Sequence, residues 1–425
     1  MPESENGNYR WNFTCASVNG FLMNVSFAVF GVTTVLPVFV NHLTDNNMWV
    51  ALISNLEIAG WHLSQLFSAA LILHLTYKMP VYRVLAVVRI ATIGAIIVLV
   101  VLVPPGPVLL LAFVAAYAVY SLAGGLAGVP FMDVVARIVP MKNRGVLFAV
   151  RRFGGGTLAL LTAYFIIEPL LETFAFPYSY AAIFAVGLIV VGIGLGAMSA
   201  TREPPGRPLT GRFSFTETLR MGAAALVNDR SFRNFYLVRA SIAVNRMAMP
   251  FYIGLALAAL QLPDSATGLF LSAQTAGFIS SNVIWGILSK RWGSKTLLVL
   301  GATASFIPPV LALSAGLFGY SAPWVYYTVF FTLGLSLTGF DLGSISYLID
   351  LSPEDRRPVY VGTMNTMSGL FLVIGLAGGY ILNRFNYETL FVLSAAGAVA
   401  AAFIAVKLRD PFRELAKRRA VISRG

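Results

Sequence analysis

The chain has 425 residues, of which 57% are hydrophobic and only 11% are charged. Soluble domains carry about 25% charged residues, so this composition excludes an ordinary soluble protein and indicates an integral membrane protein. The formal net charge of +12 is compatible with a nucleic-acid partner, but the basic residues fall on alternate loops, and we expect no nucleic acid to bind.

Apolar segments recur along nearly the whole chain. A helix needs about 20 mostly apolar residues to cross the hydrocarbon layer of a bilayer, and twelve segments meet this requirement. They lie near residues 20–42, 49–74, 83–103, 107–131, 146–167, 179–200, 235–260, 265–288, 297–317, 324–348, 360–382 and 389–406. The polar residues 1–19 do not resemble a cleaved signal peptide, so we expect the first span to stay in the protein.

Lys and Arg residues lie on one side of the predicted spans, whereas the other side has Arg384 alone. Because cytoplasmic loops carry the excess of Lys and Arg, we predict a bacterial-type inner membrane protein with both termini in the cytoplasm. The residues on the predicted cytoplasmic side are Lys78, Arg83, Arg137, Lys142, Arg144, Lys290, Arg291, Lys295, Arg356 and Arg357, with the basic segments 202–233 and 407–424.

Cysteine and histidine give little support for a metal or redox site. Cys15 is the one cysteine, which permits no internal disulfide. His42, His62 and His74 lack the spacing of metal ligands, so we interpret them as packing or interfacial residues. We therefore expect no cofactor and no metal.

The chain also matches itself when it is shifted by 213 residues, half of its length. This shift aligns Pro37 with Pro250, Pro140 with Pro353, Arg144 with Arg357 and Gly156 with Gly369. One offset that serves several such residues indicates a duplicated unit of six spans, and an even number of spans gives both copies the same orientation.

This duplication predicts three parts. Residues 1–200 form an N-terminal six-helix bundle, residues 201–234 form a cytoplasmic linker, and residues 235–425 form a C-terminal six-helix bundle with a basic tail. In the linker, Ser214 and Glu217 fit a capping box, and Phe215, Leu219 and Leu226 recur at helical spacing. We expect either an amphipathic helix on the membrane surface or a plain soluble linker helix.

One short motif, "GILSKRWGSK", follows the eighth predicted span. Together with twelve spans, two parallel repeats and a long basic central loop, it makes the chain resemble the major facilitator superfamily of secondary transporters. Gly286, Arg291, Gly293 and Lys295 match that family's loop signature G-x-L-x-D-R-x-G-R-K, while Lys290 replaces its aspartate. The resemblance implies an all-α fold of two six-helix bundles, alternating access without ATP, and a gating role for this loop.

Ionisable residues within membrane spans are candidates for functional sites, because each costs at least about 2.5 to 3.5 kcal/mol to insert. The resemblance implies that spans one, four, seven and ten line a central cavity, which places Arg246 and Asp341 on opposing walls. Our hypothesis is that they pair in the empty protein, and that a polar or anionic substrate, or a proton on Asp341, separates them. The alternative is a permanent ion pair that only fixes two helices.

Further candidates flank this pair. Arg239 lies two turns from Arg246 on the same helical stripe, and Thr338 lies one turn from Asp341. The polar side chains of Asn24 and Asn245 are expected to bond a solute in the cavity.

Glu57 lies in the outer half of span two, on one stripe with Trp61 and Gln65, and we expect no direct contact with Arg246. A carboxyl group in a medium of low dielectric constant tends to keep its proton until water reaches it, as proton coupling requires. A hydrogen-bonded packing carboxyl at the outer gate is the alternative.

Three further arginines, Arg89, Arg151 and Arg152, lie near the cytoplasmic ends of spans three and five. For Arg89 and Arg151 we expect the side chains to extend to the membrane surface. For Arg152, a surface position and an approach to another helix across the following glycines both remain open.

We therefore predict a monomeric secondary transporter, and not an enzyme, that moves a small organic, anionic or amphipathic solute by alternating access. Its partners are membrane lipid, the solute and a coupling ion, which is a proton or alternatively sodium. Glu57 and Asp341 are the candidate proton-coupling residues. One alternative is proton-driven efflux of drugs or lipid-like compounds, and another is a membrane sensor or assembly factor that does not transport.

Overall fold

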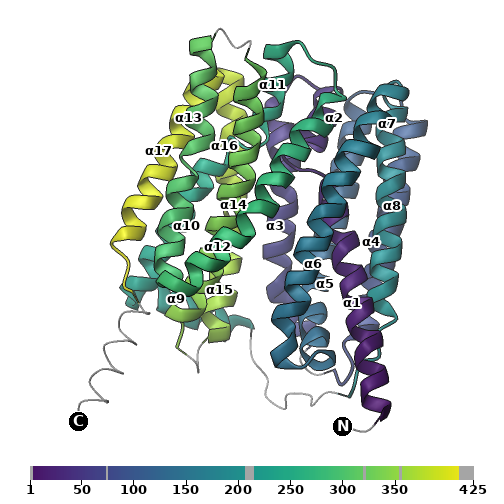
Figure 1. Ribbon diagram of the computed structural model, residues 1–425, viewed down its shortest axis with the longest axis vertical. Coiled ribbons are helices and arrows are strands. Elements are labelled where there is room, and N and C mark those ends of the chain that lie inside the picture. Colours follow the sequence, from purple (N-terminus) through teal and green to yellow (C-terminus); the bar gives the residue numbers. More distant parts are fainter. Residues whose placement is uncertain (1–2, 73–74, 206–214, 319–321, 354–356, 411–425) are drawn as a thin grey trace. The chain divides into compact units, whose positions relative to one another are not determined.

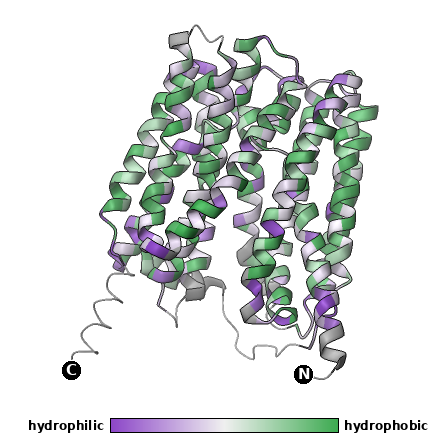
Figure 2. Cartoon of the chain, viewed as in Figure 1, coloured by the Kyte–Doolittle hydropathy of each residue, from purple (hydrophilic) through white to green (hydrophobic). Residues whose placement is uncertain are grey.

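The computed structural model describes residues 3–72, 75–205, 215–318, 322–353 and 357–410. These residues form helices joined by short turns (Figure 1), which confirms the predicted all-α class. Hydrophobic residues cover much of the helices (Figure 2), and many large apolar side chains are exposed. Such surfaces are expected where the surrounding medium is lipid.

The chain separates into two compact units. The first unit contains Met1–Arg212 and Ile253–Ser272, and the second contains Phe213–Tyr252 and Ala273–Gly425. The segment Ile253–Ser272, which the sequence analysis places in the C-terminal bundle, thus packs with the first unit. The division into bundles 1–200 and 235–425 stays a prediction.

In the first unit, α5 packs against α3 and α4, and α1 packs against α6 and α8 (Figure 1). The core is aromatic, with the ring centroids of Phe39 and Phe113 4.7 Å apart and those of Phe30 and Phe184 5.5 Å apart. The helices are α1 (Glu3–Val29), α2 (Val35–Asn41), α3 (Asn47–Ile72), α4 (Met79–Leu102), α5 (Pro107–Ile138), α6 (Met141–Thr162), a π-helical turn (Ala163–Ile167), α7 (Glu168–Thr173) and α8 (Tyr178–Ser199).

The second unit packs α10 against α17, and α13 against α14 and α17. Its core includes the buried side chains of Phe232, Phe235, Ile242 and Tyr347. The helices are α9 (Phe215–Asn228), α10 (Arg230–Arg246), α11 (Phe251–Leu260), α12 (Ala266–Ala304), α13 (Ile307–Ser314), a 3₁₀ turn (Ala315–Phe318), α14 (Pro323–Leu351), α15 (Arg357–Gly369), α16 (Phe371–Arg384) and α17 (Tyr387–Val406), of which α11 and the start of α12 belong to the first unit.

Nine helical segments in the described part of the chain are long and apolar enough to cross a membrane. They cover nine of the twelve predicted spans. The other three predictions fall on α1 with α2, on α3 and on the first part of α12. The first is split into two helices, and α3 contains Glu57 and His62 among its apolar residues. The count of twelve therefore stays a prediction.

One pair of prolines that the internal repeat aligns lies at matching breaks. Pro37 is in α2, which follows the turn after Val29, and Pro250 lies in the turn between α10 and α11. A proline lacks the N–H that would continue a helical ladder, so a break near each is expected. The matching breaks agree with a duplicated unit.

The predicted linker helix is present as α9, which packs against α15. A Cβ atom at Gly222 would lie 2.0 Å from the Thr363 hydroxyl, so α9 touches another helix and does not have all its surface free for lipid. The predicted capping residue Ser214 and the side chain of Glu217 lie outside the described residues.

Candidate functional site

Arg246 and Asp341 form an ion pair in the second unit. Nη2 of Arg246 lies 2.7 Å from Oδ1 of Asp341, and the guanidinium carbon lies 5.4 Å from the ring centroid of Phe340. The two side chains are 25% and 53% exposed. An exposed pair gains little net energy and separates readily, so a competing anion or a proton on the carboxylate can break it. The anticipated pairing is thus present, while its role in substrate binding stays a prediction.

Arg239 lies two turns before Arg246 on α10 and is partly buried. Its guanidinium is close enough to Arg246 and Asp341 to interact electrostatically with both. Arg239 thus adds a second positive charge near the Arg246–Asp341 ion pair, so these three described residues carry a net charge of about +1. Such an excess of positive charge favours an anionic ligand.

Two other predicted cavity residues of the second unit are buried, with their polar groups already in use. The Asn245 side-chain amide donates hydrogen bonds of 3.0 Å to the carbonyls of Ser305 and Ser394, and it is 8% exposed. The Thr338 hydroxyl donates to the Gly334 carbonyl at 2.9 Å and is 2% exposed. The Asn245 bonds join α10 to α17 and to the turn before α13, whereas the Thr338 bond lies within α14. Both polar groups are engaged in this conformation, and their binding role stays a prediction.

Asn24 lies in the first unit, on α1. Its side-chain amide donates to the carbonyls of Gly20 at 2.8 Å and of Arg151 at 3.3 Å. A Cβ atom at Gly155 would lie 2.7 Å from this amide, so the glycine gives it the room to approach α6. Asn24 thereby connects α1 to α6, and its binding role stays a prediction.

Glu57 lies on α3 in the first unit, where α3 and α5 approach closely. The Tyr117 hydroxyl of α5 donates to Oε2 of Glu57 at 3.2 Å. The approach depends on small residues, since a Cβ atom at Gly60 would lie 2.2 Å from the Ser121 hydroxyl. Trp61 covers Gly128 of α5, as a Cβ atom there would lie 3.1 Å from the indole ring. The side chain of Gln65 lies outside the described residues.

Arg89 and Arg151 point into the first unit, so the prediction that they extend to the membrane surface is wrong. Arg89 is 9% exposed and donates from Nη2 to the Tyr120 hydroxyl at 2.7 Å. Arg151 donates from Nη1 to the Ala16 carbonyl at 2.5 Å and to Oδ1 of Asn19 at 3.1 Å. Acceptors on neighbouring helices, which the sequence does not reveal, replace water as partners of these charges.

The comparisons with known proteins agree with this architecture. A family model described as Major Facilitator Superfamily matches residues 235–423. The fold is also that of a solved mutant of the nucleoside transporter NupG, with a TM-score of 0.72 over 94% of this chain and 99% of that one, at 14% sequence identity. The C-terminal part of the chain, residues 235–423, thus matches the major facilitator superfamily that the sequence resembles.

Among curated relatives of the chain, an uncharacterised protein of Mycobacterium tuberculosis is 22% identical over 296 residues, which are 68% of this chain and 56% of the relative. The multi-drug resistance efflux pump PmrA of Streptococcus pneumoniae is 25% identical over 199 residues, which are 45% of this chain and 46% of the pump. The chain spans about half the length of the curated relatives it matches. The family and the apolar helices identify a multi-pass membrane protein.

The family's loop signature lies at a break in α12, between the predicted spans 265–288 and 297–317, whose separation stays a prediction. Helix α12 runs through Gly286 and Arg291 and is interrupted at Gly293, whose φ of 80° and ψ of 174° suit glycine. The Arg291 side chain is exposed, and its guanidinium carbon lies 5.9 Å from the ring centroid of Trp292. Lys295, beyond the break, is partly buried. Their gating role stays a prediction.

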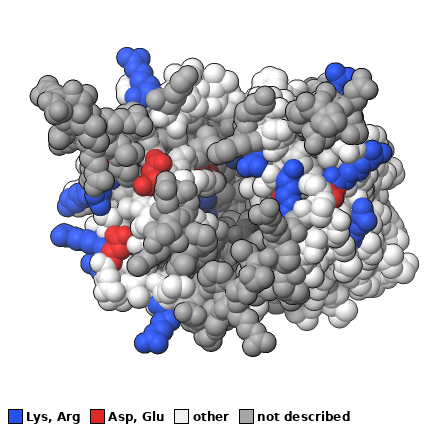
Figure 3. All heavy atoms as spheres, turned by 90° about the horizontal axis from the view of Figure 1, so that it is seen from below, with Lys and Arg blue, Asp and Glu red and all other residues white. Residues whose placement is uncertain are grey.

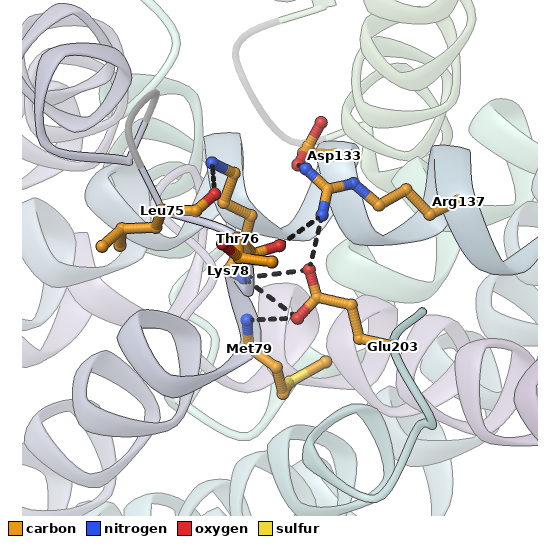
Figure 4. A network of polar contacts seen from close by, with 7 residues as sticks. All are labelled: Leu75, Thr76, Lys78, Met79, Asp133, Arg137 and Glu203. Atoms are coloured by element: carbon orange, nitrogen blue, oxygen red, sulfur yellow. Dashed lines mark hydrogen bonds and ion pairs between the residues drawn. The ribbon is translucent and has the colours of Figure 1, made fainter. Parts of the chain in front are cut away.

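In the first unit, Glu203 provides a carboxylate at the start of α4. Oε2 of Glu203 accepts hydrogen bonds from the backbone N–H groups of Lys78 at 2.9 Å and Met79 at 2.8 Å, at the start of α4 (Figure 4). Oε1 also accepts from Nη1 of Arg137 at 3.1 Å, and Arg137 pairs with Asp133. Sequence reasoning missed Glu203, although it is an acidic residue directly after a span.

His42 was also missed, because the sequence suggested only packing for it. Nε2 of His42 contacts Oδ2 of Asp264, which lies just before α12 and belongs to the same unit. The imidazole ring stacks on Phe176 with a centroid distance of 4.3 Å. A residue from each half of the sequence thus meets within one unit. The signal was present in the positions, since both residues directly adjoin predicted spans.

Proposed function

We propose that this chain is a secondary transporter that moves a small organic solute with an anionic group by alternating access. The Arg246–Asp341 pair is the observation that carries the proposal. A partly exposed guanidinium that is held by one carboxylate, with a second guanidinium nearby at Arg239, is suited to exchange that carboxylate for an anionic group of the solute. The family supports transport over an enzymatic role.

Proton coupling follows from the chemistry of the same pair. Protonation of Asp341 removes its charge and frees Arg246 for the solute, so proton and anion binding favour each other. Glu57 is the second candidate, since its carboxyl group has a hydroxyl partner at Tyr117 and no direct cationic partner among the contacts described for it. Sodium is the alternative coupling ion.

The test is uptake into liposomes under an imposed pH gradient, with solutes first selected by thermal stabilisation of the purified protein. We expect Arg246→Ala and Asp341→Asn to reduce gradient-driven uptake at least about tenfold, the effect of a lost charge-assisted contact. Arg384→Ala, which removes an exposed arginine at the end of α16, is the matched control. Full uptake by folded Arg246→Ala protein would contradict the proposed site.

Efflux of drugs or lipid-like compounds is the second candidate function, because the relative from Streptococcus pneumoniae is named as a multi-drug resistance efflux pump. The two functions differ in charge dependence. A drug pump for hydrophobic compounds would be stabilised by neutral or cationic dyes, and it would still transport them after Arg246→Ala.

For orientation, we propose an inner-membrane monomer with both termini in the cytoplasm. Figure 3 supports the proposed orientation, because the coloured side chains on the face that it shows are mostly Lys and Arg, which are in excess on the cytoplasmic side of membrane proteins. Reporter fusions at the two ends test the orientation, and a periplasmic signal from either end would contradict it.

A further inference from the structure

Arg89 of α4 is a buried cation that no carboxylate of the described residues contacts directly. Its hydrogen-bond partners in the described part of the chain are neutral, since Nη2 donates to the Tyr120 hydroxyl at 2.7 Å and Nη1 lies 4.0 Å from the Met23 sulfur. The Arg89 Nε atom is buried and has no hydrogen-bond acceptor among the described residues. A buried charged donor without a partner costs considerable free energy, which a ligand can recover.

The surroundings of Arg89 combine aromatic and small residues. The guanidinium carbon lies 4.5 Å from the ring centroid of Tyr120, which leaves one face of the group stacked. Gly124, one turn further along α5, faces the same group, because a Cβ atom there would lie 3.5 Å from Cζ and 3.6 Å from Nε. Any larger residue at this position would contact Nε. The glycine thus places no side chain of its own against the part of the guanidinium that has no partner.

The nearest acidic group in this network is Glu57, which two stacked tyrosines connect to Arg89. Tyr117 donates to Glu57, the rings of Tyr117 and Tyr120 stack with centroids 5.8 Å apart, and Tyr120 accepts from Arg89. Among the described residues, the ionisable groups that interact with Glu57 are Tyr117 of α5 and Arg89 of α4, and Tyr120 adjoins Tyr117. The sequence of α2, which also packs against α3, contains no ionisable residue.

We propose that Arg89 is the centre of a second anion-binding position, inside the first unit, for the carboxylate of a small organic molecule, and that Glu57 controls it. When Glu57 is ionised, its negative charge balances Arg89 from a distance. When Glu57 is protonated, Arg89 is left without a counter-charge and takes up the carboxylate. One proton and one anion therefore enter the unit together. This inference rests on the proposed transport function, but binding of the anion can be measured without transport.

The probe is benzoate, a monocarboxylate with an apolar body, titrated into the purified protein in detergent and followed by calorimetry at pH 5.5 and pH 8. We expect saturable binding that is tighter at pH 5.5. Arg89→Gln should weaken this binding about tenfold. Glu57→Gln should bind at pH 8 as tightly as the wild type binds at pH 5.5. Arg10→Gln, an exposed arginine on α1, is the matched control.

Gly124→Ala provides a test that keeps the charge and the fold. Its methyl group would be in ordinary van der Waals contact with the guanidinium, so the helix packing tolerates it while access to Nε is reduced. We expect benzoate affinity to fall severalfold. If Arg89→Gln does not fold, Gly124→Ala and Glu57→Gln decide the question. Wild-type affinity in Arg89→Gln at pH 5.5 would overturn the proposal. So would wild-type affinity in Gly124→Ala together with binding by Glu57→Gln at pH 8 that is as weak as the wild type's at that pH. A wild type without saturable benzoate binding at pH 5.5 would overturn it as well.

The two proposals fail separately. The same titration with Arg246→Gln reports on the site in the second unit, and the part of the benzoate binding that depends on Arg89 should persist in that variant. If uptake into liposomes is absent but Arg89 still controls benzoate binding, the transport function fails and the binding site stands. If uptake is present and Arg89→Gln leaves both uptake and benzoate binding unchanged, the transport function stands and the Arg89 binding site fails.

Discussion

The carboxylate of Glu203 accepts a hydrogen bond from the backbone N–H of Met79 at 2.8 Å, although 124 residues separate them in sequence. The same side chain, 3% exposed, also meets the N–H of Lys78 and the guanidinium of Arg137. An acid at the start of a helix satisfies N–H groups that have no partner within the helix and interacts favourably with the helix dipole. Glu203 therefore holds the segment that follows α8 against the start of α4.

Glu203→Ala should destabilise the protein by about 3 kcal/mol, because it leaves buried donors and a cation without their acceptor. Thermal unfolding in detergent measures the change. Glu172→Ala, at an exposed glutamate on α7, is the control and should unfold at the wild-type temperature. Equal unfolding temperatures for Glu203→Ala and wild type would show that this network adds no stability.

Lys78 predicts a pH dependence. Burial lowers the pKa of the Lys78 ammonium below its usual value, which nearby Asp133 and Glu203 only partly offset. Between this lowered pKa and that of the unfolded chain, the unfolded state binds more protons, so stability should rise with pH in this window.

The measurement compares the unfolding temperature of wild type and Lys78→Met from pH 7 to pH 10.5. The wild type should gain stability relative to the variant as pH rises toward the unfolded pKa. The bond from Nζ to the Leu75 carbonyl, 2.5 Å, is missing in the variant at every pH and shifts only the baseline. A wild type that loses stability relative to Lys78→Met as the pH rises would contradict the assignment.

Two glycines of the second unit offer a matched pair. A Cβ atom at Gly334 of α14 would lie 2.0 Å from the Gln274 carbonyl oxygen of α12, whereas one at Gly286 of α12 would meet nothing within 4 Å. Gly334→Ala should therefore cost about 1 to 3 kcal/mol through overpacking. Gly286→Ala should be neutral or stabilise by up to about 1 kcal/mol. Thermal unfolding of both variants checks the contrast, and equal effects would refute the close helix contact.

Asn245 tests whether a polar residue in a span serves packing or binding. Asn245→Ala removes two hydrogen bonds to the carbonyls of Ser305 and Ser394, which should lower stability by about 2 kcal/mol. Because the amide is engaged in these bonds, solute affinity measured on the folded variant should stay within about twofold of wild type. A large loss of affinity with unchanged stability would instead support the predicted cavity role.

The sequence predicted the features that follow from hydrophobic pattern and charge. Apolar runs identified the helices, and the cost of burying charge singled out Arg246 and Asp341, which are in contact. Residue type alone does not decide the role of Asn245, because an amide beside a helix break can bond backbone carbonyls as well as a solute. The inward position of Arg89 and the partners of Glu203 depend on which helices are neighbours, and neither residue type nor spacing contains that information.

The break after Arg246 has a further consequence for the ion pair. Arg246 is the last residue of α10, where the carbonyl groups give the helix a partial negative charge. Such a helix end stabilises a cation by about 0.3 to 1 kcal/mol, and by up to about 2 kcal/mol where it is partly buried. The arginine thus keeps part of its electrostatic support when Asp341 gains a proton, and it can stay in place with its charge free for an incoming anion.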